Sequence, residues 1–328
     1  MGQSLAAVDP EANPTEVTAI GGASDYFTSA EITTSSAGNP LIDINLKSGG
    51  SQQWQLIPTA GVADEEFTYS GQNETGTLTT VDIDYSNGTS LITKIPAGNT
   101  AVIAGNGSTV NAGNGNYAIV AGDNSTIKAG NGTDTVIGGS NDTITLGNGN
   151  DTVLGGSNDT IQAGNGADTI STGANSSVTA GNNPDTVTVG DNSKVVLGNG
   201  QDQVTAGAIA TINLGNGADT VTSGGNSTIT VGNGNDTIYV GKNDTVTVGT
   251  GQDSFVFHQT AAGNIGAVTI NHFNTSTDLI TFSKQLTTAD SYQDNAQGNA
   301  VITVDAGDTI TLVGVHSSAL HPSNVQFV

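Results

Sequence analysis

Cysteine and arginine are both absent from this chain, and aromatic residues make up only 4% of it. Without cysteine there can be no disulfide, so an extracellular protein of this kind would need another cross-link, and a bound metal can serve. Six lysines stand against 30 acidic residues, which gives a formal net charge of −24. That charge argues against nucleic acid and anionic membranes as partners, and it favours calcium and other cations.

Long apolar runs and catalytic motifs are missing as well. No apolar run reaches 18 residues, so we expect no transmembrane segment. The N-terminus lacks the basic region and apolar core of a conventional signal peptide. Neither His-Glu-x-x-His nor Gly-x-Ser-x-Gly occurs, and the four histidines are scattered through the C-terminal part as His258, His272, His316 and His321. We therefore expect no catalytic residues and a protein that is not an enzyme.

Glycine is abundant, and it recurs in a fixed pattern. The tripeptide Gly-Asn-Gly, or a close relative, returns every 17 residues at anchors Gly113, Gly130, Gly147, Gly164, Gly181, Gly198, Gly215, Gly232 and Gly249. A fixed period of this length in a segment rich in Gly, Thr, Val and Ile predicts a solenoid in which one repeat forms one coil.

Each coil divides into a first half of nine residues and a second half of eight. Gly and Asn predict a turn at the start of each half, and the last three or four residues predict a short strand. The first half should send one aliphatic row inward, Val136, Val153, Ile170, Val187, Val204, Val221 and Ile238. The second half should send two, which begin with Ile127, Ile144 and Ile161 and with Ala129, Leu146 and Ala163.

An aspartate follows every anchor from the second onward by four residues. This aspartate row comprises Asp134, Asp151, Asp168, Asp185, Asp202, Asp219, Asp236 and Asp253. Coils of a β-solenoid lie about 4.8 Å apart, and at an effective dielectric of about 20 each neighbouring pair of carboxylates would repel by roughly 3 kcal/mol. A cation between the coils would reverse this sign.

Calcium is the cation that fits, because it accepts carboxylates together with backbone carbonyls. Zinc is disfavoured, since the repeats contain neither Cys nor His, and magnesium is a poor match for a cage made only of protein oxygens. The alternative is that these aspartates only form Asx turns, as they can in a metal-free solenoid.

The unit Gly-Asn-Gly-x-Asp-Thr-Val resembles the calcium-binding nonapeptide Gly-Gly-x-Gly-x-Asp-x-U-x of RTX proteins, which fold as a parallel β-roll. The resemblance implies calcium ligands at the aspartate row and at the Asn and Gly before it, which are Asn131, Gly132, Asn148, Gly149, Asn165, Gly166, Asn199, Gly200, Asn216, Gly217, Asn233 and Gly234.

The second half of each coil departs from this motif, since its aspartate survives only at Asp142, Asp159 and Asp244. We expect one edge lined by several calcium ions and a second, mostly calcium-free edge. That second edge has its own file of asparagines, Asn124, Asn141, Asn158, Asn175, Asn192, Asn226 and Asn243, broken at Ile209. Stacked Asn side chains could hydrogen-bond from coil to coil there.

The fold prediction is all-β. Residues 98–257 form the β-roll, and Tyr117, which replaces the aspartate at the first anchor, caps it. Residues 1–20 form a flexible or exchangeable arm, residues 21–97 a small β-sheet or β-sandwich domain, and residues 258–328 a C-terminal β cap. Phe255 and Phe257 should plug the roll. The tail resembles that of RTX substrates of type I secretion, which implies an uncleaved secretion signal there.

The function expected from these features is that of a secreted or cell-surface calcium-binding structural protein. It would fold outside the cell and self-assemble as a surface layer, biofilm matrix or filament subunit. Its partners would be calcium, further copies of itself and the type I secretion apparatus. The alternatives are an extracellular adhesin or ice- or glycan-binding β-roll, because outward Thr-x-Thr pairs recur, and an accessory module of an enzyme.

Overall fold

The computed structural model describes residues 106–258, 265–282, 291–305 and 308–327, and before residue 106 it describes the backbone of strands β1 to β8. The described part is all-β apart from two short 3-10 helices, which confirms the predicted class. Neither of these helices is long or apolar enough to cross a membrane. The chain divides into two compact units, unit 1 (residues 1–173) and unit 2 (residues 174–328).

The N-terminal part of unit 1 contains antiparallel strands. β1 (Glu16–Val17), β2 (Phe27–Thr34), β3 (Pro40–Leu46) and β4 (Ser51–Gln55) form one antiparallel sheet in that order. β5 (Glu66–Tyr69) pairs antiparallel with β6 (Thr80–Asp84), whereas β6 pairs in parallel with β8 (Thr100–Ala104). β7 (Leu91–Ile92) likewise pairs in parallel with β9. Apart from β1, the predicted arm at 1–20 lies outside the described residues, and the boundary at 97 stays a prediction.

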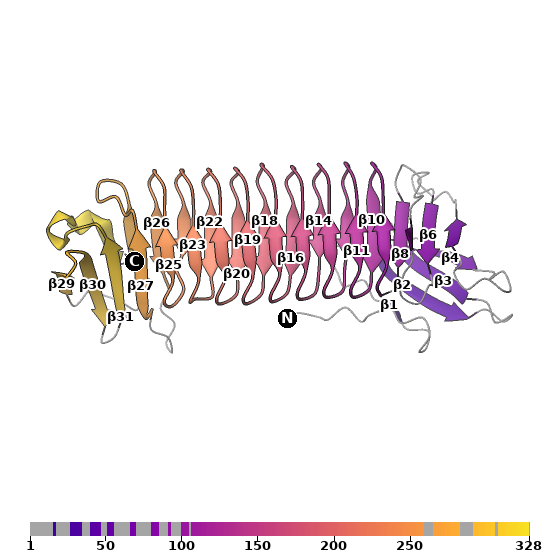
Figure 1. Cartoon of the computed structure of the whole chain (residues 1–328), viewed down its shortest axis with the longest axis horizontal. Helices are drawn as coiled ribbons and strands as arrows, with labels where there is room; N and C mark the ends of the chain where they lie inside the picture. The colour runs from indigo at the N-terminus through magenta and orange to yellow at the C-terminus, as the bar shows by residue number, and fades with distance from the viewer. Residues whose placement is uncertain are drawn as a thin grey trace. The chain divides into compact units, whose positions relative to one another are not determined.

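From β8 onward, unit 1 is a parallel β-solenoid (Figure 1). Its first sheet continues from β8 through β10 (Tyr117–Ala121), β12 (Thr135–Ile137), β14 (Thr152–Leu154) and β16 (Thr169–Thr172). Its second sheet contains β9 (Thr109–Asn111), β11 (Thr126–Lys128), β13 (Thr143–Thr145) and β15 (Thr160–Gln162). Every pairing from β8 to β16 joins residues 17 apart, so the sequence period is the coil period.

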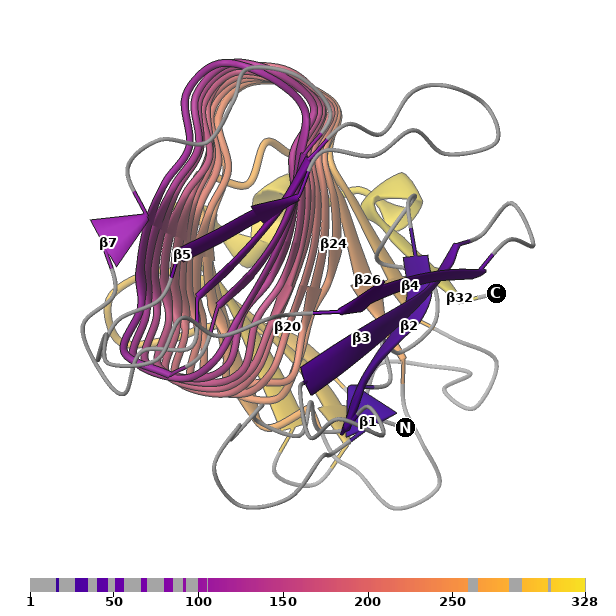
Figure 2. The same ribbon diagram turned by 90° about the vertical axis from the view of Figure 1, so that its right-hand side faces the viewer.

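Unit 2 repeats this arrangement. Its first sheet contains β18 (Thr186–Val189), β20 (Gln203–Ala206), β22 (Thr220–Ser223), β24 (Thr237–Tyr239) and β26 (Ser254–Phe257). Its second sheet contains β17 (Ser177–Thr179), β19 (Lys194–Val196), β21 (Thr211–Asn213), β23 (Thr228–Thr230) and β25 (Thr245–Thr247). Seen along its axis, each coil is a flattened loop with a strand on either long side and a turn at either end (Figure 2).

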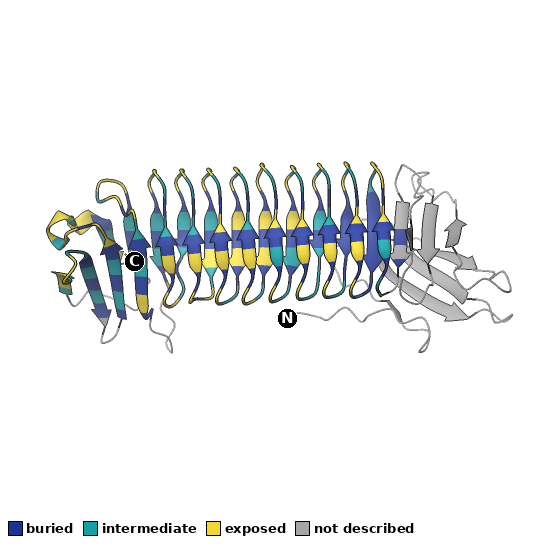
Figure 3. Cartoon of the chain, viewed as in Figure 1, coloured by how far each residue is buried: buried dark blue, intermediate teal, exposed yellow. Residues whose placement is uncertain are grey.

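The core lies between the two sheets, and the predicted aliphatic rows form it. The inward residues of the middle coils are at most 7% exposed, and buried strand positions alternate with exposed turns in Figure 3. One row was missed by the sequence analysis. Several first-sheet strands are four residues long, so the residue two places after the predicted one also points inward. This row includes Val189, Ala206 and Val240.

The C-terminal end continues the parallel pairing before it becomes antiparallel. β26 pairs in parallel with β28 (Leu279–Phe282), and β28 with β32 (Val325–Phe327). β25 pairs with β27 (Ala267–Asn271), and β27 with β31 (Asp308–Val313). β30 (Ala300–Asp305) then pairs antiparallel with β31, and β29 (Ser291–Asp294) pairs antiparallel with β30. The helices η1 (Ser317–Ala319) and η2 (Pro322–Asn324) precede β32.

The predicted phenylalanine plug is partly corrected by this pairing. Phe255 and Phe257 are fully buried, as expected. They do not end the coil stack, because the parallel strands β28 and β32 continue it. Phe257 instead begins a ring stack with Phe282, at 5.4 Å between ring centroids, and Phe282 stacks on Phe327 at 5.2 Å. Successive aromatic rings thus fill this end of the core, in the offset contacts that aromatic pairs favour.

Candidate metal site along the first edge

The first edge of each unit is the set of turns with the sequence Gly-Asn-Gly-x-Asp. The aspartate of each turn directly precedes a first-sheet strand, and every member of the aspartate row is at most 2% exposed. A carboxylate withdrawn from water needs hydrogen bonds or a cation, because an isolated buried charge is strongly unfavourable. The two carboxylate oxygens meet this need differently.

The Oδ1 atoms are held by the protein itself. In unit 1 the backbone N–H of Asp134 donates to Asp151 Oδ1 at 2.8 Å, and the N–H of Asp151 donates to Asp168 Oδ1 at 2.9 Å. In unit 2 the same bond joins Asp185 to Asp202 at 2.9 Å and repeats in the following coils. Each turn is therefore fixed to the next through one carboxylate oxygen.

The series of hydrogen bonds from backbone N–H groups to Asp Oδ1 atoms forms a ladder. At each end of this ladder stands a residue from outside the aspartate row. The N–H of the fully buried Tyr117 donates to Asp134 Oδ1 at 2.9 Å, so Tyr117 begins the ladder in place of an aspartate. Asp278 ends it, because its Oδ1 accepts the N–H of Asp253 and its Oδ2 accepts the N–H of Asn274. Asp278 was not among the predicted site residues, since it lies 25 residues after Asp253 and outside the period.

The Oδ2 atoms of six members of the row lack such partners among the described residues. This oxygen is buried and accepts no hydrogen bond from any described residue in Asp134, Asp151, Asp202, Asp219, Asp236 and Asp253. Buried polar atoms in native proteins are almost always satisfied, so a file of unsatisfied carboxylate oxygens calls for a bound group. That group must be positively charged.

Backbone carbonyls of the second glycine, where a turn has one, are further oxygens that a cation could use. The first glycine's carbonyl accepts the N–H of the next coil's first glycine, as Gly130 O does from Gly147 at 3.1 Å. Among the described residues no hydrogen bond reaches the carbonyls of Gly132 and Gly149. In unit 2 the second glycine also lies against the carboxylate, since a Cβ on Gly200 would stand 2.6 Å from Asp202 Oδ1.

In the coils that carry it, the second glycine leaves no room for a side chain; a single coil has Asn183 at this position, with φ 122°. Gly149 has a φ of 155°, and a Cβ there would collide with the carbonyl oxygen of Gly132 in the preceding coil. We expect Gly149→Ala to destabilise the calcium-bound protein by about 2 kcal/mol or more. Thermal unfolding in calcium measures this. Gly113→Ala is the control, because its new methyl would meet only Tyr117 Oη at 3.9 Å; equal losses in both variants would contradict the explanation.

The asparagines of the Gly-Asn-Gly turns form a second ladder that the sequence analysis did not foresee. Asn131 Oδ1 accepts both the N–H and the Nδ2–H of Asn148, at 2.9 and 3.2 Å, and Asn148 Oδ1 accepts the same pair from Asn165. Asn199, Asn216 and Asn233 repeat this in unit 2. Their side chains are exposed and engaged with one another, and the carbonyls of Asn148 and Asn216 accept N–H groups from the preceding coil. The geometry therefore favours aspartate and glycine oxygens as ligands, and the predicted ligand role of asparagine stays a prediction.

The second edge satisfies its polar atoms mostly without a metal. Its buried row mixes aspartate with serine: Ser125 N–H donates to Asp142 Oδ1, and Ala210 N–H donates to Ser227 Oγ. Asp159 Oδ2 accepts the Thr172 hydroxyl at 3.0 Å, and Asp244 Oδ2 accepts the Gly241 N–H at 2.7 Å. Asp142 Oδ2 is the exception, because it is buried and accepts no hydrogen bond from any described residue. The second edge therefore fits the expectation of a mostly, but not entirely, calcium-free edge.

The asparagine file of the second edge has a conformational role. All seven members have a left-handed backbone with φ between 55° and 65°, a conformation that Asn adopts more readily than most residues. The predicted coil-to-coil bond occurs between Asn243 Nδ2 and Asn226 Oδ1 at 3.1 Å.

Burial also changes the proton affinity of the aspartate row. Desolvation raises the pKa of Asp134 to about 6 and that of Asp151 to about 7, and hydrogen bonds from the preceding coil only partly offset it. In unit 2 burial raises the pKa of Asp219 and Asp253 to about 6 and that of Asp236 to about 7. The metal-free row therefore attracts protons near neutral pH, and a cation would compete with them.

The described residues contain no cluster of three or more His, Cys, Asp or Glu side chains. A cation on the first edge would therefore draw one carboxylate from a turn and complete its coordination with main-chain oxygens. Six to eight hard oxygen ligands suit calcium. The residues present thus fit calcium, which would neutralise the row and join adjacent turns.

Fold and site together define a parallel β-solenoid whose turns are built to bind calcium. Residues 111–140, 138–157, 154–177, 215–246 and 222–255 match the family of RTX calcium-binding nonapeptide repeats. The chain thus contains RTX repeats that form a calcium-binding β-roll, as the resemblance implied. No characterised protein sequence matches the chain significantly.

Proposed function

We propose that this protein is secreted, folds outside the cell when calcium binds to its first edge, and then self-assembles as a surface layer, biofilm matrix or filament subunit. The observation that carries the proposal is that the buried Oδ2 atoms of Asp134, Asp151, Asp202, Asp219, Asp236 and Asp253 accept no hydrogen bond from any described residue. Such a file opposes folding in the absence of a cation and supports it in the presence of one.

The proposal makes calcium concentration the switch for folding. Where calcium is scarce, the carboxylates repel one another and the chain stays unfolded and fit for translocation. Where calcium is abundant, the free energy of binding contributes directly to folding. RTX repeats generally occur in secreted proteins, which supports export, and we propose the type I apparatus as the route.

A structural role is favoured over a catalytic one by the surroundings of the histidines. His272 Nδ1 lies 3.3 Å from the carbonyl of Val248, and His316 lies 3.4 Å from Asp294 on an exposed surface. Among the described residues, no hydrogen bond joins either imidazole to a hydroxyl group. We therefore propose that the chain is not an enzyme.

The test is the state of the protein refolded from denaturant, first in excess chelator and then in millimolar calcium. We expect an unfolded monomer in chelator and ordered assemblies in calcium, seen by circular dichroism, light scattering and electron microscopy. Magnesium at the same concentration should not substitute, because it demands near-octahedral geometry and retains its waters. A folded protein in chelator at pH 8 would refute the switch. A single species of 32.6 kDa in calcium at every concentration would refute assembly.

An alternative, an adhesin or an ice- or glycan-binding β-roll, is favoured by one surface of unit 2. Thr211, Thr228, Thr245, Thr269 and Thr311 occupy successive register positions of its second sheet. The first three are exposed and the other two are half-buried. The file stops at Lys194, which occupies the position before Thr211. A folded, soluble monomer in calcium that binds ice or a glycan would support this alternative.

A further inference from the structure

Ile209 interrupts the asparagine file on the second edge of unit 2. It occupies the position that Asn192 and Asn226 hold in the adjoining coils, and it has the same left-handed backbone, with φ 62°. A β-branched residue rarely adopts this conformation, because its side chain crowds the backbone. The Ile209 side chain is also 57% exposed, more than Tyr292 (42%) and Val313 (38%), the other exposed large hydrophobic residues of the described part.

The hydrogen bonds of its own coil do not require the Ile209 side chain. The backbone N–H of Ile209 donates to Gly225 O at 2.8 Å, a bond that any residue could make. Its neighbours are held independently, since Ala208 N–H donates to Asp191 Oδ1 and Ala210 N–H to Ser227 Oγ. An exposed, strained apolar side chain is a candidate for contact with another molecule.

The charge around Ile209 differs from that of the chain as a whole. Lys194 is exposed and pairs in register with Thr211, two residues after Ile209. Lys242 is exposed two coils further along the same edge, where its carbonyl accepts the N–H of Asn226. The exposed Asp191 lies one coil earlier, where its Oδ1 accepts the N–H of Ala208. For a protein with net charge −24, this edge is therefore a place that a second acidic copy can approach.

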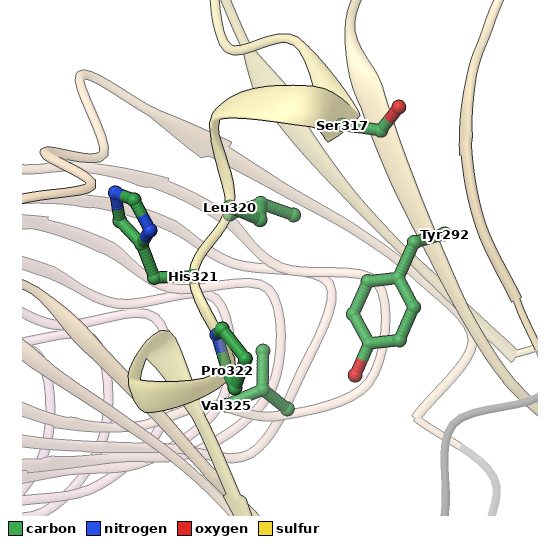
Figure 4. A pocket seen from close by; sticks show the side chains of 6 residues that line it. All are labelled: Tyr292, Ser317, Leu320, His321, Pro322 and Val325. Atoms are coloured by element: carbon green, nitrogen blue, oxygen red, sulfur yellow. The ribbon is translucent and has the colours of Figure 1, made fainter.

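The C-terminal end of unit 2 offers an apolar pocket. Tyr292 lies on one side of it, and Leu320, Pro322 and Val325 lie on the other, with Ser317 and His321 completing the lining (Figure 4). Its volume is about 390 Å³, near the lower end of the range for ligand pockets. That is room for a branched aliphatic side chain. Asp294, exposed and two residues after Tyr292 on β29, places a carboxylate beside it, where Oδ1 accepts the Ser317 N–H at 2.6 Å and Oδ2 lies 3.4 Å from His316 Nδ1.

We propose that Ile209 of one copy inserts into the pocket formed by Tyr292, Leu320, Pro322 and Val325 of a second copy. Lys194 and Lys242 beside the isoleucine complement Asp294 beside the pocket. Because the two surfaces differ, the contact is heterologous, and repetition produces an open chain of copies unless the rotation closes into a ring. The inference rests on the proposed self-assembly and names the contact that drives it.

The first test replaces Ile209 with the residue that its neighbouring coils carry. Ile209→Asn relieves the backbone and should leave the unfolding temperature in calcium unchanged or higher. The protein concentration needed for half-assembly should rise at least about tenfold, as for removal of a buried apolar anchor. Val313→Thr is the control, because it removes another exposed hydrophobic side chain outside the pocket. Unchanged assembly of Ile209→Asn overturns the inference and leaves the proposed function intact.

The second test uses the absence of cysteine from the chain. Copies with Ile209→Cys are mixed in calcium with copies carrying Leu320→Cys and oxidised mildly. We expect a disulfide-linked heterodimer, and little of it when the second variant is Val313→Cys. Equal yields from both mixtures overturn the inference. A wild-type protein that never associates in calcium overturns both the contact and the proposed assembly, whereas calcium-dependent folding would still stand.

Discussion

Asp151→Asn is expected to weaken calcium binding at its site at least about tenfold, equivalent to about 1.4 kcal/mol, and to stabilise the metal-free protein at neutral pH. These opposite effects follow from one cause. The amide keeps an oxygen for the N–H of Asp134, now 2.8 Å from Oδ1, but it removes the charge that a cation requires and that burial opposes. Calcium titrations followed by circular dichroism measure the first effect, and the β-sheet signal of both proteins in chelator at pH 7 measures the second.

Asp159→Asn is the matched control, because it lies in the same coil and is equally buried, at 1% exposed. Its Oδ1 accepts the N–H of Asp142, and its Oδ2 accepts the Thr172 hydroxyl, which also bonds to Gly156 O. An amide at position 159 can donate to that hydroxyl, so the midpoint of the calcium titration should hardly move. If both variants shift the midpoint equally, the division into a calcium edge and a metal-free edge is wrong.

The repeat made the coil and its core predictable. A strict period fixes the register of every parallel pair, so residues such as Val136 and Val153 had to share a row. It also placed the aspartates in one file. The row at Val189 and Val240 was missed, because strand length within a coil depends on hydrogen bonding and not on the period.

The sequence could not predict which oxygen of each carboxylate accepts a backbone N–H and which is left for a cation. Whether Oδ1 or Oδ2 meets a backbone N–H depends on side-chain rotation within the turn. For the same reason the Asn131–Asn148 ladder was not separated from the ligand set. The break at Ile209 was visible, but its left-handed backbone became clear only from the structure. Before residue 98 the sequence has no repeat that would fix which residues of neighbouring strands pair. It therefore predicted strands in this region but not their pairing partners.

Lowering the pH is expected to replace calcium in part. Burial raises the pKa of Asp134 to about 6 and those of Asp151 and Asp236 to about 7 in the folded, metal-free protein, against about 3.9 for aspartate in an unfolded chain. The folded state therefore binds more protons than the unfolded state between about pH 4 and pH 7. Stability in that window falls as pH rises. The stability that these protonated carboxyl groups contribute is fully present below about pH 4 and is lost once the pH passes about 7.

In chelator, the β-sheet signal should therefore be stronger at pH 4.5 than at pH 8, and Asp151→Asn should flatten this dependence. Calcium reverses the trend, because protons and calcium compete for the same carboxylates and binding tightens as pH rises. In weakly buffered solution at pH 6, calcium should release protons, which a pH electrode measures directly. If the metal-free protein is more stable at pH 8 than at pH 4.5, other groups of the protein already compensate the charge of the aspartate row. Folding would then not depend on a cation.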